Sequence, residues 1–230
     1  MLRIILSGCH GRMGRQVAAL CEECDGLAVT AGLDRRGRPA DSFPVFSDPE
    51  ACRADADVLV DFSHSDALGP LLRCCIRHNL PAVLAVTGYS AEAQRQIKTA
   101  ARSIPIFRAA NLSLGANVLL RLTRQASAAL GPDYDAAITE RHHCGKLDAP
   151  SGTALLLAEA LSPAPTGLFS IRAGTTAGEH TVLFAGQDEV LELTHRADSR
   201  RVYAMGAVKA AQFIARTENP GLYGMDDLLK

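Results

Sequence analysis

A regular alternation of short apolar runs and segments with helical spacing fills the first half of the chain. The first run, LRIIL at 2–6, ends in a glycine-rich turn, and a segment with helical spacing follows at 15–24. Further strands are predicted for LAVTAGLD at 27–34, ADVLVDFS at 56–63, PAVLAVTG at 81–88 and IPIFRAANLS at 104–113. This alternation predicts an α/β fold in which helices cover a parallel sheet.

Two of the intervening helices carry specific signals. Ser90 precedes the helical segment AEAQRQIKTAARS and is a predicted N-cap, because its hydroxyl can accept from a free backbone N–H. Pro70 is expected to interrupt the helix predicted over 65–79, because proline within a helix removes a hydrogen bond.

Three glycines follow the first predicted strand with the spacing G-x-x-G-x-x-G, at Gly8, Gly11 and Gly14. Glycines here permit a tight turn and the close approach of a pyrophosphate to the N–H groups of a helix N-terminus. Asp34 ends the second predicted strand, where a carboxylate can accept a hydrogen bond from an adenosine ribose. Together these residues favour a Rossmann-like dinucleotide-binding domain over a merely structural glycine-rich turn.

The choice between NADH and NADPH stays open at this point. Arg35 and Arg36 directly follow Asp34, and a guanidinium beside the ribose would suit a 2′-phosphate. The alternative is a solvated loop, since RRGRPADS at 35–42 is rich in turn residues. Ligands of parallel sheets lie beyond the carboxyl ends of strands, so the loops at 62–63, 87–88 and 110–111 are also predicted to face the cofactor.

A different architecture is predicted for the second half. A long amphipathic helix at 113–131 precedes longer strands with alternating patterns, which favour an antiparallel sheet in a second, α+β domain. A helix and a short tail after a Pro-Gly break end the chain. The predicted division is a dinucleotide-binding domain at 1–112 with 206–230, and a substrate-binding domain at 113–205.

The densest group of reactive side chains is ERHHCGKLDAPSGT, at 140–153. Adjacent strand residues point to opposite faces, so His142 and His143 are expected to have different tasks. His142 is a candidate acid or base near neutral pH, and His143 a candidate for orienting a carboxylate. Lys146 lies in the following loop, where its ammonium could attract an anion and deliver a proton to a carbanion.

A predicted helix begins after Pro150, with Ser151 as its cap. The backbone N–H groups of Gly152 and Thr153 are then available to bind a substrate carboxylate. His195 and Arg200 follow the last long strand, and Arg200 is a candidate for clamping a second carboxylate. For the arginine, a place in a solvated loop is the alternative.

The residue types in this region have two other interpretations. His142, His143 and Cys144 all carry metal-ligating atoms, but consecutive ligands diverge and no second ligand pair at zinc spacing accompanies them, so no metal is predicted. Nucleophilic catalysis by Ser151 or Cys144 is the other, although a helix cap is a simpler role for the serine.

The composition excludes several classes of function. The net charge is −1 and no segment combines basic with aromatic residues, which argues against nucleic-acid binding. No apolar run reaches membrane-spanning length, and the first run is too short for a secretion signal. Seven cysteines, mostly in apolar stretches, favour reduced thiols and a cytoplasmic location. The C-x-x-C pair Cys21 and Cys24 lies late in a predicted helix, which disfavours a redox role.

The motifs resemble the 4-hydroxy-tetrahydrodipicolinate reductase (dihydrodipicolinate reductase) family. The similarity covers nearly the whole chain, and its most specific part is E-x-H-H-x-x-K-x-D-x-P-S-G-T-A at 140–154. Other matching segments are GCHGRMGR at 8–15, VDFS at 60–63, AANLSLGANV at 109–118, AGEHTVLFAG at 177–186 and ELTHRADSR at 192–200.

The resemblance implies reduction of a cyclic dicarboxylate by NADH or NADPH, in the pathway to diaminopimelate and lysine. It implies a nucleotide-binding domain joined to a mixed-sheet domain that forms a homotetramer. His142 is the implied acid/base and Lys146 the proton donor, with His143, Gly152, Thr153 and Arg200 as substrate contacts. The implied cofactor contacts are Gly8, Cys9, His10, Gly11, Arg12, Met13, Asp34, Arg35, Ala85, Val86, Thr87, Ala109, Ala110, Asn111 and Leu112.

Two positions depart from the family pattern. Ala85 and Val86 stand where the family usually has G-T, and Leu112 where an aromatic residue is common. Two alternative functions are another two-domain dehydrogenase of an amino-acid-derived imine or carbonyl, and a regulator that senses NAD(P)H without catalysis.

Overall fold

The computed structural model describes residues 1–37, 40 and 42–230, and the chain divides into two compact units. The first unit contains residues 1–112 and 203–230, and the second contains residues 113–202. The chain returns to the first unit at residue 203, three residues before the predicted boundary at 206. Helix α6, which packs in the first unit, already begins at Arg201. Arg38, Pro39 and Asp41 of the predicted solvated loop lie outside the described residues.

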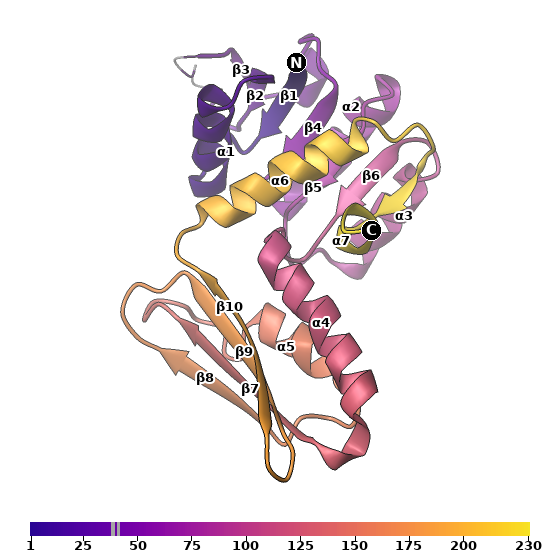
Figure 1. Ribbon diagram of the computed structural model, residues 1–230. Coiled ribbons are helices and arrows are strands. Elements are labelled where there is room, and N and C mark those ends of the chain that lie inside the picture. Colours follow the sequence, from indigo (N-terminus) through magenta and orange to yellow (C-terminus); the bar gives the residue numbers. More distant parts are fainter. Residues whose placement is uncertain (38–39, 41) are drawn as a thin grey trace. The chain divides into compact units, whose positions relative to one another are not determined.

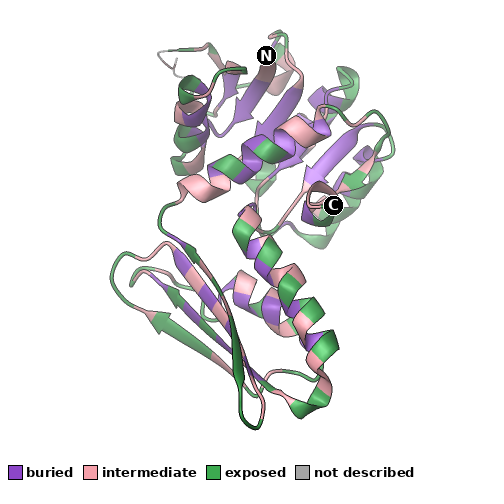
Figure 2. Cartoon of the chain, viewed as in Figure 1, coloured by how far each residue is buried: buried purple, intermediate pink, exposed green. Residues whose placement is uncertain are grey.

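A parallel sheet forms the centre of the first unit, as the alternating pattern predicts (Figure 1). Within the described residues its strand order is β11-β6-β5-β4-β1-β2-β3, and every pairing is parallel. Its central strands are almost wholly buried (Figure 2), as expected for a parallel sheet covered on both faces. The strands are β1 (Leu2–Ser7), β2 (Leu27–Leu33), β3 (Val45–Phe46), β4 (Val58–Asp61), β5 (Ala82–Leu84), β6 (Pro105–Arg108) and β11 (Gly221–Tyr223).

Helices pack on both faces of this sheet. On one face, α2 (Leu68–Arg77) and α3 (Ala91–Ala100) contribute Leu71 and Ile97 to a core that contains Leu59 of β4. On the other face, Phe213 of α6 (Arg201–Ile214) meets Phe107 of β6 at a ring-centroid distance of 6.1 Å. Helix α1 (Arg12–Glu23) follows the glycine-rich turn, and α7 (Met225–Leu228) ends the chain. The unit is therefore doubly wound.

The structure confirms one of the two helix signals and corrects the other. The Ser90 hydroxyl accepts a hydrogen bond from the Ala93 N–H, which makes it the predicted N-cap of α3. Pro70 does not interrupt its helix, because α2 begins only at Leu68, after the short 3-10 turn Ser65–Ala67. Proline is tolerated in a first helical turn, where its missing N–H would have no intrahelical partner.

The C-terminal tail also differs from the prediction of a simple break and tail. Gly221–Tyr223 forms the edge strand β11 and pairs in parallel with β6. Three residues are too few for an alternating pattern to be visible in the sequence, so this strand was missed.

The second unit is a four-stranded sheet with two helices (Figure 1). Its described strands, in the order β10-β9-β7-β8, are β7 (Asp135–His142), β8 (Gly167–Arg172), β9 (Gly178–Ala185) and β10 (Val190–Ala197). Strand β8 pairs in parallel with β7, which corrects the antiparallel prediction for this strand and gives the mixed sheet that the resemblance implies. The parallel pairing follows from the connection, since helix α5 (Gly152–Glu159) crosses between β7 and β8.

Helices α4 (Leu114–Leu130) and α5 cover one face of this sheet with an apolar core. One row across the four strands on this face consists of Leu168, Ile138, Val182 and Leu193. The next row on the same face consists of Ser170, Glu140, His180 and His195. The sheet therefore changes from apolar to polar within two residues of each strand, and this change places the candidate active site.

None of the helices formed by the described residues combines the length and the apolar character needed to cross a membrane.

Candidate active site

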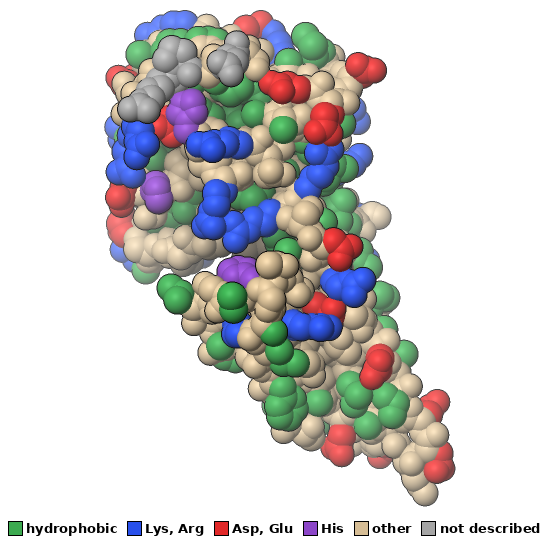
Figure 3. Space-filling view, turned by 90° about the vertical axis from the view of Figure 1, so that its left-hand side faces the viewer, with side chains coloured by type: hydrophobic (Ala, Val, Ile, Leu, Met, Phe, Trp, Pro, Cys, Tyr) green, Lys and Arg blue, Asp and Glu red, His purple; other side chains and the backbone are tan. Residues whose placement is uncertain are grey.

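A cavity of about 510 Å³ lies at the carboxyl ends of β1, β2 and β4 in the first unit. Gly8, His10 and Gly11 line it from the glycine-rich turn, and Asp34 and Arg35 line it from the end of β2. Lysine, arginine and histidine side chains gather on one face of this unit (Figure 3). The cavity has the position that parallel α/β sheets use for ligands, and its charge suits the phosphates of a dinucleotide.

The glycine-rich turn has the geometry of a pyrophosphate cradle. Gly8 has a φ of +74°, and a Cβ there would lie 2.8 Å from the backbone of Phe62. A Cβ at Gly14 would lie 2.2 Å from the Gly8 carbonyl oxygen, so only glycine lets α1 pack this close to the turn. Gly11 is the N-cap of α1 and provides no side-chain cap, so nothing from that residue covers the helix N-terminus. These residues fit a nicotinamide dinucleotide.

The other predicted cofactor residues lie outside the lining of this cavity. Cys9 is buried and its thiol packs toward Gly32, so only its backbone can face a cofactor. Arg12 and Met13 form the first turn of α1 outside the lining of the cavity. Residues 85–87 and 109–112 follow β5 and β6 at the same sheet edge, also outside that lining.

The lining of the cavity includes further residues, some expected from the sequence and some not. Arg36, a candidate for a place beside the ribose, lines it with Phe62 and Ser63 of the predicted loop after β4. Ser47, His64 and Asp66 also line it and were not predicted. The Arg36 N–H donates to Asp34 Oδ1 at 3.1 Å, which orients the carboxylate at the end of β2. An aspartate side chain commonly accepts a hydrogen bond from the backbone N–H two residues later, so Asp34 already signals this turn in the sequence.

Asp61 is a fully buried carboxyl group next to this cavity, at the end of β4. The Ser63 N–H donates to its Oδ1 at 3.0 Å, and the Ser63 hydroxyl donates at 2.5 Å. Burial raises the pKa of Asp61 and outweighs the hydrogen bonds from Ser63, which act in the opposite direction. Ionised Asp61 is therefore unfavourable in the folded chain.

We predict that Asp61→Asn makes the chain more stable at neutral pH, by on the order of 1 kcal/mol. The raised pKa means that the folded state binds a proton more readily than the unfolded state, so wild-type stability rises as the pH falls toward the unfolded-state value. Asparagine keeps an oxygen for Ser63 and removes this dependence. Urea unfolding at several pH values measures it, and a variant with an unchanged pH slope contradicts the prediction.

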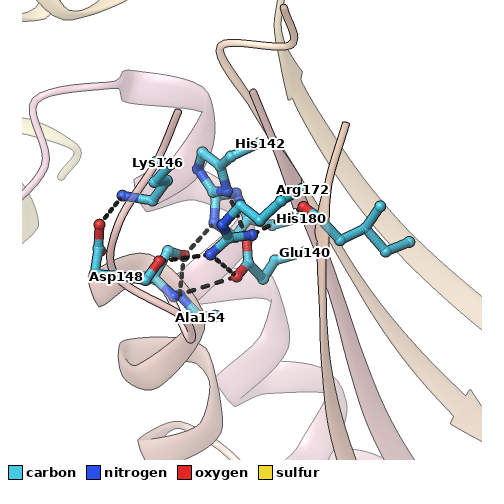
Figure 4. Close-up of polar contacts among 9 residues, drawn as sticks. Glu140, His142, Lys146, Asp148, Ala154, Arg172 and His180 are labelled. Carbon is cyan, nitrogen blue, oxygen red and sulfur yellow. Dashed lines mark hydrogen bonds and ion pairs between the residues drawn. The ribbon is translucent and has the colours of Figure 1, made fainter. Parts of the chain in front are cut away.

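In the second unit, Glu140 and His142 lie two residues apart on β7 and face the same side of the sheet (Figure 4). The Nδ1 of His142 is hydrogen-bonded to Glu140 Oε2. Arg172 of β8 donates to both Glu140 oxygens, from Nη1 at 3.0 Å and from Nη2 at 2.7 Å. His180 of β9 contacts the His142 ring edge to face, with the centroids 5.2 Å apart. Four polar side chains therefore meet where the apolar core ends.

The surroundings set the protonation of these groups. Burial tends to raise the pKa of Glu140, but hydrogen bonds from Arg172, Ser170 and His142 outweigh it and lower this pKa to about 2. Burial lowers the pKa of His142, although Glu140 opposes the change. Burial and the nearby His142 lower the pKa of His180 to about 4. At neutral pH the carboxylate is thus ionised and His180 is neutral, while His142 is biased toward its neutral form.

The loop after β7 carries Lys146, and the helix after it begins as predicted. Lys146 Nζ donates to Asp148 Oδ1 at 2.7 Å. The Ser151 hydroxyl accepts from the Ala154 N–H at 3.2 Å and is the N-cap of α5. Gly152 and Thr153 form the first turn of this helix. His142, Lys146 and the start of α5 are therefore brought together by one strand, one loop and one helix.

The remaining predicted residues are less closely grouped. His143 lies just beyond β7, and its N–H donates to the Thr176 carbonyl at 2.8 Å. Arg200 lies between β10 and α6, so its role as a carboxylate clamp stays a prediction. His195 lies within β10 rather than after it, and its Nε2 is 3.3 Å from the Ser113 hydroxyl at the start of α4. Its position indicates packing between sheet and helix.

The group of metal-ligating atoms that lie close together in the structure is not that of the consecutive residues His142, His143 and Cys144. Among the described residues, ligand atoms of Glu140, His142 and His180 lie within 4.8 Å of one another. Both Glu140 oxygens already accept from Arg172, so the group is organised around a guanidinium. Cys144 is exposed in the loop. A hydrogen-bonded acid–base cluster therefore accounts for these side chains.

A doubly wound sheet with a glycine cradle for a dinucleotide, in a chain whose second unit carries this acid–base cluster, defines a two-domain nicotinamide-dependent oxidoreductase. Residues 2–112 match the family model described as "Dihydrodipicolinate reductase, N-terminus", and residues 115–229 match "Dihydrodipicolinate reductase, C-terminus". The chain belongs to the 4-hydroxy-tetrahydrodipicolinate reductase family, as its motifs indicated.

Curated relatives agree with this assignment over their full length. A 4-hydroxy-tetrahydrodipicolinate reductase from Caldanaerobacter subterraneus subsp. tengcongensis is 41% identical, with 100% of this chain and 99% of the relative covered. The enzyme of that name from Clostridium novyi is 40% identical with the same coverage. Among solved structures, a dipicolinate-bound dihydrodipicolinate reductase from Paenisporosarcina sp. TG-14 has a TM-score of 0.85 at 22% identity, with 99% of both chains covered. This last similarity concerns the fold.

Proposed function

We propose that this chain reduces 4-hydroxy-tetrahydrodipicolinate, a cyclic dicarboxylate, to tetrahydrodipicolinate in diaminopimelate and lysine biosynthesis. The 4-hydroxyl group leaves as water, and the conjugated dihydro ring that remains takes up one hydride and one proton. The observation that carries the proposal is the cluster of His142, Lys146 and the α5 N-terminus in the second unit of a chain from this reductase family. The reaction needs a site that binds two carboxylates and supplies one proton, and this group of residues offers both.

On the cofactor side, Gly8 to Met13 would hold the pyrophosphate, and Asp34 with Arg35 the adenosine ribose of NADH or NADPH. Residues 85–87 and 109–112 would contact the nicotinamide end, from the carboxyl ends of β5 and β6. When bound, the reduced nicotinamide supplies a hydride to the substrate ring. The role of the first unit is to bind and orient this cofactor.

On the substrate side, the N–H groups of Gly152 and Thr153 would bind one carboxylate at the start of α5. A Cβ at Gly152 would meet no atom of the described chain within 4 Å, so the space above this turn is open to a ligand. His143 and Arg200 would contact the substrate from the ends of β7 and β10. The fixed N–H groups at the helix start orient the dicarboxylate.

The proton comes from Lys146 in this proposal. After reduction the ring carries a carbanion-like centre, and the Lys146 ammonium delivers a proton to it. His142, with its hydrogen on Nδ1 and a free lone pair on Nε2, accepts hydrogen bonds at neutral pH and serves as the acid/base partner. In this proposal Lys146 in the loop donates the proton, and His142 on β7 accepts hydrogen bonds.

The direct test supplies the purified chain with the cyclic product of dihydrodipicolinate synthase and follows oxidation of NADH and NADPH in parallel. We expect substrate-dependent oxidation with at least one of them. If a cofactor binds, as shown by its fluorescence, but is not oxidised when this substrate is present, the proposed reaction is wrong. Comparison of the two cofactors also decides the preference that Asp34, Arg35 and Arg36 leave open.

We further propose a cytoplasmic homotetramer assembled through the outer face of the second unit's sheet. The seven cysteines are free, which fits a reducing compartment. On the sheet, Phe169, Ile171 and Val190 are 59%, 45% and 58% exposed, which is unusual for large apolar side chains on strands. Burial against copies of the same face would remove them from water.

Charge at this surface should therefore change the assembly. We predict that Phe169→Glu lowers the mass of the particle in sedimentation, because four like charges would meet at the interface. The matched control is Leu222→Glu, which changes an exposed apolar residue of β11 in the first unit. A tetramer that survives Phe169→Glu unchanged would place the interface elsewhere.

A further inference from the structure

Arg172 fixes a buried carboxylate at the centre of the acid–base cluster. Its guanidinium donates from two nitrogens to the two different oxygens of Glu140, at 3.0 and 2.7 Å. The side chain of Glu140 is 0% exposed and that of Arg172 is 17% exposed. The planar fork of arginine matches the carboxylate in this bidentate geometry. The carboxylate orientation is thus set from the neighbouring strand β8.

Glu140 in turn determines which nitrogen of His142 carries hydrogen. An ionised carboxylate only accepts hydrogen bonds, and it contacts Nδ1 of His142. The neutral imidazole must then carry its hydrogen on Nδ1, and Nε2 keeps its lone pair. Without Arg172, burial would favour the protonated form of Glu140. A carboxylic acid can pair with either tautomer, because it accepts from an Nδ1–H through its carbonyl oxygen and donates its O–H to an unprotonated Nδ1. A single tautomer therefore depends on the arginine.

The same guanidinium also holds the loop that carries Lys146 (Figure 4). Arg172 Nη2 donates to the backbone carbonyl of Asp148 at 2.6 Å. At the end of the loop, the Ser151 N–H donates to Glu140 Oε1 at 3.3 Å. Lys146 lies between the end of β7 at His142 and the first of these anchors, and it is itself hydrogen-bonded to Asp148. The ion pair therefore constrains both the strand end with His142 and the far end of the lysine loop.

We propose that Arg172, acting through Glu140 and the Asp148 carbonyl, is a positioning residue that sets the His142 tautomer and fixes the Lys146 loop for proton transfer. The inference rests on the proposed function and extends it to two residues that do not themselves exchange the proton. Stability alone accounts poorly for the pair, because apolar residues of similar volume often replace buried ion pairs without loss. One guanidinium donates to both oxygens of Glu140 and to the Asp148 carbonyl, and this arrangement indicates that Arg172 orients the carboxylate and the loop.

Replacement of Arg172 should separate positioning from binding. For Arg172→Gln we expect kcat to fall ~10–100-fold, as for residues that orient a reactive group, while KM changes less than about threefold. Arg172→Lys restores a positive charge beside Glu140 without the fork, so its kcat should lie between the wild type and Arg172→Gln. Glu140→Gln should lose kcat as Arg172→Gln does, because an amide does not fix the tautomer.

Nitrogen NMR of the histidine side chains provides a readout that needs no turnover. The wild type should show His142 as a single Nδ1–H tautomer, with the signal assigned by its absence in His142→Gln. Arg172→Gln should show a mixture of tautomers. Arg95→Gln is the matched control, since Arg95 forms an exposed ion pair with Glu92 on α3. Neither kcat nor the His142 signal should change in the control.

Thermal unfolding identifies variants that fold poorly, and Arg172→Lys then decides the question. The proposal is overturned if a folded Arg172 variant keeps the wild-type kcat or changes only in KM. It is also overturned if His142 keeps a single Nδ1–H tautomer in folded Arg172→Gln. A wild-type chain that does not turn over the substrate would contradict the proposed function instead. The tautomer comparison would still test the positioning role in that case.

Discussion

Replacement of Lys146 by alanine should lower kcat by ~10²–10⁴-fold, the range for loss of a general acid, and leave cofactor affinity close to that of the wild type. The residue lies in the loop between β7 and α5, in the second unit. The cavity with the dinucleotide cradle is lined by residues of the first unit. In the proposed reaction, proton delivery and cofactor binding therefore depend on different parts of the chain.

Steady-state kinetics and fluorescence titration of the reduced cofactor measure the two effects separately. The matched control is Lys98→Ala, which removes a lysine from the exposed last turn of α3. Lys146→Arg adds a second test, because it keeps the positive charge but donates a proton far less readily than an ammonium. If Lys146→Ala loses kcat and cofactor affinity equally, or if Lys146→Arg retains full kcat, the assigned role is wrong.

The nucleotide-binding half could be predicted from the sequence because its constraints are local. The strand at 2–6 and the glycines that follow it require one arrangement, and the structure has a parallel sheet with Gly8 at a positive φ. Two of the wrong predictions concern features that depend on more than the local pattern. Pro70 has the chemistry of a helix breaker, but it lies in the first turn of α2, where proline is tolerated. Strand β11 forms because β6 lies beside it and pairs with it.

The candidate site shows the same limit more clearly. The segment at 140–153 makes His142 and Lys146 candidates, because reactive side chains cluster within one short stretch. Arg172 and His180 come from other strands, and only the register of β7 with β8 and β9 brings them to Glu140 and His142. A partial signal existed in the sequence, since Glu140 and His142 alternate with exposed residues on the same strand.

The buried histidines should also make the fold sensitive to acid. Because burial and the neighbouring His142 lower the folded-state pKa of His180 to about 4, the unfolded chain binds a proton at His180 before the folded chain does. This contribution to stability is complete above the unfolded-state pKa of about 6.5 and is lost as the pH falls from there to about 4. The difference corresponds to a loss of about 3 kcal/mol over that interval.

We predict that His180→Gln removes most of this acid dependence. Glutamine places a polar group near the Ser151 hydroxyl, 3.0 Å from His180 Nε2, and it does not titrate. Urea unfolding between pH 7 and pH 4 should therefore give a flatter stability profile than the wild type, while exposed His78→Gln leaves the profile unchanged. His142, with a pKa lowered in the same direction, accounts for part of the remaining slope. A wild-type slope in folded His180→Gln would mean that His180 is not the group that takes up the proton on unfolding.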